Sequence, residues 1–148
     1  MYEFVDRPVA RLGPGGRFVL WAMRGWIHAA SNGRCPPGAL APAFARHGVL
    51  PALPHVHTLL AELNRRARRK IAFAPLAHCT IGDDEAVLLQ ISHDADACPS
   101  RARATLSLLL EEDAVENAFG ALLTAVGHLR EGGLGKIGMK TTGMAGPP

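Results

Sequence analysis

Cysteines and neighbouring histidines are the residues of this chain whose types suit metal binding. Cys79 directly follows His78, and Cys35 lies in an earlier proline-rich turn. Thiolate and imidazole are the ligands that zinc prefers, and a structural site needs four of them in a tetrahedral array. The sequence therefore offers Cys35, His78 and Cys79 as ligands of a zinc ion, with Cys98 or His93 completing the set.

The spacing of these residues gives the metal site little support. The chain has neither a Cys-x-x-Cys pair nor a His-x-x-x-His pair, and His55 and His57 would lie about 160° apart around a helix. Free cysteines are often buried for packing reasons alone. Cys35 and Cys98 each precede a proline, and a Cys-Pro pair can present its thiolate to haem iron. No cofactor is predicted outright; zinc is the first candidate and haem the more remote one.

A second candidate is the densest run of cations in the chain, which comprises Arg65, Arg66, Arg68, Arg69 and Lys70. Several cations on one face can displace the counterions of nucleic-acid phosphates. They can equally attract an acidic protein surface. Nucleic-acid recognition also needs base-contacting residues or stacking aromatic rings, and none accompanies the run. The alternative is a basic face that is solvated or paired within the chain.

Catalytic motifs are absent from the sequence. It contains no Gly-x-Ser-x-Gly elbow, no P-loop and no His-Glu-x-x-His motif. The consecutive acids Asp83, Asp84 and Glu85 would point in different directions from a helix and make no acid/base pair. No catalytic residue is predicted, and the sequence favours a binding role over an enzymatic one.

The composition bounds the fold that must position these groups. A chain of 148 residues is one domain by length, and its hydrophobic content of 48% with only 5% aromatics favours helices over a β-sandwich. No apolar run approaches the roughly 20 residues that span a bilayer. The N-terminus carries acids where a signal peptide is basic. We expect a soluble cytoplasmic protein without a disulfide framework.

Charge is divided unevenly along the chain. Residues 1–79 hold eleven Arg or Lys against three acids, a net charge of +8, whereas residues 80–148 hold five against ten, a net charge of −5. One interpretation is that the two halves attract each other when they pack. The other is that the basic half keeps a face for an acidic partner.

Apolar periodicity and helix caps predict five or six helices. The expected spans are 17–30, 36–47, 54–71, 80–93 with Thr80 as its N-cap, a helix capped by Ser100, and 113–130 with Asp113 in a capping box. In the third helix, Glu62 would pair with Arg66 one turn on. An irregular arm is expected over residues 1–16. Residues 1–131 form the predicted domain, and 132–148, with too little to bury, form a flexible tail.

The middle third of the chain resembles a known family. From Leu59 to Leu89 the sequence reads LLAELNRRARRK, then IAFAPLAHCT, then the acidic helix start DDEAVLL. This order resembles a small family of alphaproteobacterial proteins that are short, all-helical and without assigned activity. The family tends to carry several cysteines and a proline in the turn where this chain has Leu76 to Cys79. The resemblance implies a helical fold and supplies no function.

The sequence thus predicts a compact all-α bundle that acts by binding. It would be an interaction or regulatory protein that presents the basic face of residues 65–70 to an acidic protein partner, or a homo-oligomer such as a dimer, with no membrane partner. The two alternatives are a helical protein that binds metal or haem around Cys79 and a nucleic-acid-binding protein.

Overall fold

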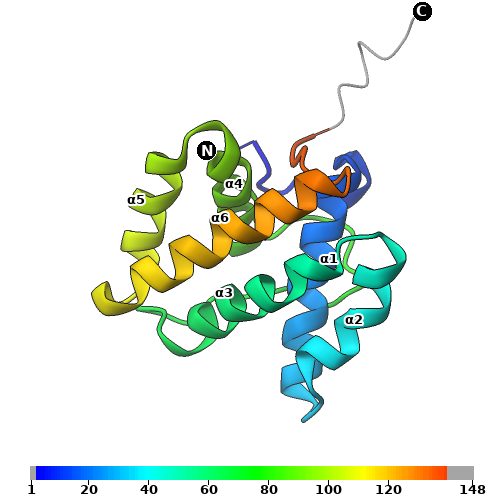
Figure 1. Ribbon diagram of the computed structural model, residues 1–148, viewed down its shortest axis with the longest axis horizontal. Helices are drawn as coiled ribbons and strands as arrows, with labels where there is room; N and C mark the ends of the chain where they lie inside the picture. Colours follow the sequence, from blue (N-terminus) through cyan, green and yellow to red (C-terminus); the bar gives the residue numbers. More distant parts are fainter. Residues whose placement is uncertain (1–2, 140–148) are drawn as a thin grey trace, which may run out of the picture.

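The computed structural model describes residues 3–139, which fold into a bundle of helices (Figure 1). Its α-helices are α1 (Pro14–Ser31), α2 (Pro36–Arg46), α3 (Leu53–Arg65), α4 (Asp83–Ala97), α5 (Pro99–Leu109) and α6 (Val115–Glu131). Short 3-10 turns occupy Val9–Arg11, Leu50–Ala52 and Glu112–Ala114. Within residues 3–139 there is no β-strand beyond isolated bridges. The all-α prediction is confirmed.

Proline and glycine set several of the helix boundaries. Pro14, Pro36 and Pro99 each stand at the first position of a helix, where the missing N–H costs nothing. Gly33 follows the end of α1 with a φ of 70°, a conformation that glycine adopts without steric cost. α2 therefore begins at the predicted Pro36, whereas α1 begins at Pro14, three residues before its predicted start and within the stretch expected to be irregular.

The helices pack in pairs around one core. α3 and α6 lie side by side, α2 follows α1 as its neighbour, and α4 packs against α5 (Figure 1). The largest fully buried side chains come from every helix except α3, and also from the segments that flank the bundle. They are Phe4, Leu12, Leu20, Leu40, Phe44, Ile81, Leu89, Ile91, Leu106, Leu110, Leu122 and Ile137. None of the helices in this part of the chain is long and apolar enough to cross a lipid bilayer.

The third helix is shorter than predicted. It ends at Arg65, and residues 66–75 run in bends and extended backbone instead of continuing to Ile71. Ala67, Ile71 and Phe73 still pack against the core. Their spacings of four and two residues place them on one face of an extended chain, and the first spacing also fits a helix. The apolar pattern alone could not separate the two conformations.

The predicted caps of the later helices also shift. Gly82, not Thr80, precedes the first residue of α4, and the carboxylate of Glu85 accepts a hydrogen bond from the Gly82 N–H at 2.9 Å. α5 begins at Pro99, one residue before Ser100. Asp113 lies in a 3-10 turn ahead of α6. The acids Asp83, Asp84 and Glu85 do occupy the first turn of α4, where the helix dipole stabilises negative charge.

Residues 132–139 belong to the folded domain, although they were predicted to begin a flexible tail. Ile137 is 2% exposed, and Met139 forms an isolated antiparallel bridge with Leu12 of the N-terminal arm. Gly13 donates a backbone hydrogen bond to the carbonyl of Gly138 at 3.0 Å. The arm is irregular, as expected, but it is packed, because Phe4 and Leu12 are fully buried. The remainder of the predicted tail, 140–148, lies outside the described residues.

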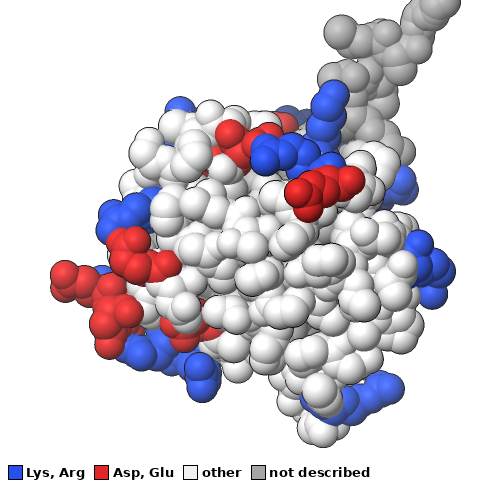
Figure 2. Space-filling model, viewed as in Figure 1, with Lys and Arg blue, Asp and Glu red and all other residues white. Residues whose placement is uncertain are grey.

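Charged side chains gather around the margin of the face formed by α3 and α6, and the centre of that face is uncharged (Figure 2). Three ion pairs join the basic half of the chain to the acidic half: Arg24 with Glu85, Arg69 with Asp84, and Arg66 with Asp113. The attraction between the two halves that the sequence indicated is therefore present in the fold.

Candidate functional site

A groove of about 790 Å³ lies beside the cation run. Its walls are formed by the C-terminal end of α1, the last two turns of α3 and the segment 67–73. The lining residues are Ile27, Ala30, Ser31, Leu60, Leu63, Asn64, Ala67, Arg68, Arg69, Lys70, Ile71, Ala72 and Phe73. The apolar floor of this groove consists of its partly exposed apolar side chains, which are Ile27, Ala67, Ile71 and Phe73, and three cations line the groove beside them.

The segment that carries these cations is fixed at its start by backbone hydrogen bonds. The N–H of Arg68 donates to the carbonyl of Leu109 at 2.8 Å, and the N–H of Glu111 donates to the carbonyl of Arg66 at 2.9 Å. Ala67 pairs with Leu110 as an isolated bridge. These bonds replace the helical ones that residues 66–69 would otherwise make, which is why α3 ends at Arg65.

Two carboxylates at the start of α4 fix the other end of the segment. The N–H of Ala72 donates to Oδ2 of Asp84 at 2.7 Å, and the N–H of Ala74 donates to Oε2 of Glu85 at 3.0 Å. The acids of the first turn therefore do more than complement the helix dipole. They satisfy backbone donors of a segment that makes no secondary structure of its own.

The five predicted cations have different environments in the fold. Arg69 binds both carboxylate oxygens of Asp84, at 3.1 and 2.7 Å. Arg66 pairs with Asp113 rather than with Glu62, although its backbone N–H still donates to the Glu62 carbonyl at 2.7 Å.

Among the described residues, the other three cations make no hydrogen bond to a carboxylate oxygen. Arg65 lies 3.7 Å from Oε1 of Glu62, a distance too long for a hydrogen bond. Arg68 and Lys70 have no carboxylate partner within residues 3–139. Both line the groove and are exposed. The charge that remains available at this site is that of Arg68 and Lys70.

The pairing with Arg69 affects the ionisation of Asp84. Hydrogen bonding from the Arg69 guanidinium lowers the pKa of Asp84 below its ordinary value of 3.8; the Ala72 N–H adds to this, and partial burial opposes it. A group whose pKa is lowered by folding stabilises the protein above its unfolded-state pKa and loses that contribution as the pH falls through its folded-state pKa.

We therefore expect Asp84→Asn to lower the free energy of unfolding by about 1 kcal/mol at pH 7, since Arg69 is largely exposed and water screens the pair. The difference between the variant and the native chain should shrink as the pH falls from 3.8 through the lower folded-state pKa of Asp84. Protonation of Asp84 then removes the charge that Arg69 binds. Urea denaturation at pH 7, 5 and 3 measures it. Asp83→Asn, an exposed neighbour in the same turn, is the matched control. A deficit independent of pH would contradict the assignment.

A buried ion pair underlies the groove-forming segment. Nε of Arg24 donates to Oε2 of Glu85 at 2.7 Å, and Nη2 donates to Oε1 at 2.9 Å. The same guanidinium donates to the carbonyls of His78 at 2.8 Å and Thr80 at 2.9 Å. Arg24 and Glu85 are 3% and 0% exposed. One side chain of α1 thereby joins α4 to the turn that carries His78 and Cys79.

Burial of Glu85 opposes its ionisation, but hydrogen bonds outweigh that effect. Arg24 and the backbone N–H groups of Gly82 and Ala74 bind the carboxylate and keep the pKa of Glu85 below its ordinary value. Sequence reasoning missed Arg24. The available signal was a lone cation inside a helix that is otherwise apolar nearly all round, since such a charge must find a partner when buried.

The structure does not support the predicted metal ligands. Cys35 and Cys79 are exposed, and the ring Nε2 of His78 lies 3.2 Å from the hydroxyl of Thr80. Within the described part of the chain, no three or more His, Cys, Asp or Glu residues are grouped so that they could hold a metal ion. The sequence placed Cys35 and Cys79 together on residue type alone, which carries no information on distance.

The two residues named as a fourth ligand lie in settings of their own. Nδ1 of His93 is 3.0 Å from the carbonyl of Ile137, in the segment that follows α6. Cys98 precedes α5, where hydrogen bonds from the Ser100 hydroxyl and the Arg101 N–H lower the pKa of its thiol. The partners of His93 and Cys98 in these contacts include neither Cys35 nor Cys79.

The histidines of α3 point to different partners, as their spacing indicates. Nε1 of Trp26 donates to Nδ1 of His57 at 3.0 Å, whereas the ring of His55 stacks on that of His128 with centroids 5.7 Å apart. His57 thus accepts a hydrogen bond through Nδ1, which requires that nitrogen to be unprotonated. These rings tie α3 to α1 and to α6.

Comparison with known proteins adds no relative to this description: no protein-family model matches the chain, and neither a curated protein nor a solved structure matches it.

Proposed function

We propose that this protein is a binding protein, without catalytic activity, whose groove takes an acidic segment of a protein partner that also carries apolar side chains. The observation that carries the proposal is the pairing of unneutralised cations with an apolar floor in one groove. Arg68 and Lys70 line it together with Ile27, Ile71 and Phe73, which are partly exposed. This is a narrower version of the basic face expected over residues 65–70, because Arg66 and Arg69 are occupied by Asp113 and Asp84.

The rigidity of the segment supports the proposal. Backbone bonds to Leu109 and Glu111 at one end, and to Asp84 and Glu85 at the other, hold residues 66–74 before any partner arrives. A surface that is already ordered loses less conformational entropy on binding than a mobile one. The cations also attract an acidic partner at a distance and so raise the association rate.

An apolar floor favours a protein partner over a nucleic acid. A phosphate backbone offers charge but no aliphatic side chains to pack against Ile27 and Ile71, which are partly exposed in the groove. Single-stranded bases would need aromatic rings on which to stack, and Phe73 is the one aromatic residue that lines the groove. We therefore place nucleic-acid binding second.

The test is binding of labelled probes to the full chain, followed by fluorescence anisotropy. The probes are a peptide that alternates Glu with Leu, a poly-Glu peptide of the same length, and a single-stranded oligonucleotide. We expect the Glu-Leu peptide to bind more tightly than either of the other two probes. Arg68→Glu/Lys70→Glu should weaken its binding about tenfold, which is about 1.4 kcal/mol. The matched control, Arg11→Glu/Arg17→Glu, changes net charge equally at two exposed cations elsewhere.

Three outcomes would count against the proposal. Equal weakening by both double variants would mean that only net charge matters. Preference for the oligonucleotide would favour the nucleic-acid alternative. Equal binding of poly-Glu and the Glu-Leu peptide would remove the role of the apolar floor.

A further inference from the structure

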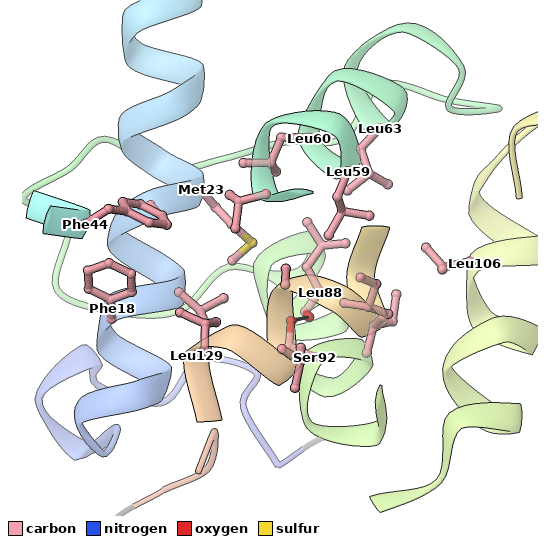
Figure 3. Close-up of a pocket in the computed structure, with 17 residues that line it drawn as sticks. Phe18, Met23, Phe44, Leu59, Leu60, Leu63, Leu88, Ser92, Leu106 and Leu129 are labelled. Carbon is pink, nitrogen blue, oxygen red and sulfur yellow. Dashed lines mark hydrogen bonds between the residues drawn. The ribbon is translucent and has the colours of Figure 1, made fainter. Parts of the chain in front are cut away.

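The centre of the bundle contains an apolar cavity of about 40 Å³, toward which side chains from all six described helices converge (Figure 3). Phe18 and Met23 reach it from α1, Leu88 from α4 and Leu129 from α6. Protein interiors are packed as densely as organic crystals and contain few voids larger than a water molecule. A void at the meeting point of six helices is therefore a feature that needs an explanation.

The walls of the cavity provide no site for water. Of the residues that line it, all but Ser92 are apolar. The hydroxyl of Ser92 donates to the carbonyl of Leu88 at 2.9 Å, within its own helix. A buried water molecule needs two to four polar partners, and cavities that lack them stay dry. An occupant of this cavity must be uncharged and apolar.

The size of the cavity bounds the occupant. On the same measure a water molecule needs roughly 10–15 Å³, so about 40 Å³ holds a group several times larger. Met23, an unbranched and flexible side chain, can move to admit more. The wall nearest to solvent consists of Val19, Val56 and Leu59, which are partly exposed, so a small molecule would enter between α1 and α3.

We propose that this cavity is a binding site for a small uncharged apolar molecule, such as an aromatic ring or a short hydrocarbon. An empty cavity of this kind destabilises a protein because its lining atoms lack contacts on one side. A ligand that fills it restores those contacts and stabilises the native state. The site is independent of the proposed acidic partner, although Leu60 and Leu63 line both the cavity and the groove.

The experiment uses benzene as the probe and the full chain as the protein. Benzene should raise the thermal midpoint of the native chain and shift the NMR signal of the Met23 methyl group. Ala125→Leu fills the cavity from α6 and should weaken benzene binding at least about tenfold. Leu108→Ala removes a side chain that is 77% exposed on α5 and should leave benzene binding unchanged.

A second variant covers the case in which Ala125→Leu does not fold. Leu129→Ala enlarges the cavity and should strengthen benzene binding, since more of the ring then fits. The proposal is overturned if benzene leaves the Met23 signal unchanged, or if it stabilises Ala125→Leu as much as the native chain. It is also overturned if sub-micellar decanoate binds and benzene does not, because the ligand would then need a charged head group.

Discussion

Replacing Arg24 by methionine is expected to lower the free energy of unfolding by about 3–5 kcal/mol, the cost of leaving one partner of a buried ion pair alone. Glu85 would remain inside the protein with no countercharge. The carbonyls of His78 and Thr80 would also lose their donors, so the turn that they belong to would detach from α1. Urea denaturation followed by circular dichroism measures the loss.

Two further variants separate charge from packing. The double variant Arg24→Met/Glu85→Met has no unpaired charge and should be more stable than Arg24→Met alone. Arg24→Lys keeps the charge but not the bidentate geometry and should fall between the native chain and Arg24→Met. A double variant no more stable than the single one would show that the buried charge is not the source of the loss. Arg66→Met, from an exposed pair, should leave the denaturation midpoint nearly unchanged.

Alanine at position 15 is expected to destabilise the protein by about 1–3 kcal/mol, the usual cost of overpacking. A Cβ there would lie 2.4 Å from the carbonyl oxygen of Leu134 and 2.6 Å from that of Lys136. Both are backbone atoms, which cannot rotate away as a side chain can. The segment 132–139 would have to lift from α1, and amide hydrogen exchange in that segment should accelerate.

The same substitution at Gly120 is the matched control and should have the opposite sign. Gly120 lies in α6, and an added Cβ would meet nothing within 4 Å. Alanine there should raise the free energy of unfolding by about 0.5–1 kcal/mol through helix propensity alone. If both substitutions changed stability in the same direction, the contact between Gly15 and the segment after α6 would not be the cause.

Local sequence signals were sufficient for the helical class and for most helix boundaries. Pro36 and Gly33 act within a turn or two of their own positions, so their effect can be predicted without knowing the fold. The end of α3 could not be found in this way. Hydrogen bonds to Leu109 and Glu111, more than forty residues away, decide it.

The candidate site was predictable in its charge but not in its shape. The cation run is visible in the sequence, yet Asp84 neutralises Arg69, and that pairing depends on where α4 lies. The groove brings Ile27 of α1 beside Leu60 of α3, which no spacing rule connects. Burial of Ile137 was likewise unforeseen, because its carbonyl contacts His93 of α4, and the neighbouring Met139 pairs with Leu12 of the N-terminal arm.

The contact between that arm and the segment after α6 has a consequence for synthesis on the ribosome. The arm is translated before the helices described here, yet Leu12 gains its bridge partner only when Met139 has been made. Contacts so distant in sequence raise contact order and form late. Until then Leu12, fully buried in the finished protein, lacks that pairing, although the start of the arm can already bond to residues 79–81. The described fold can therefore be completed only after its last residues, up to Met139, have been translated.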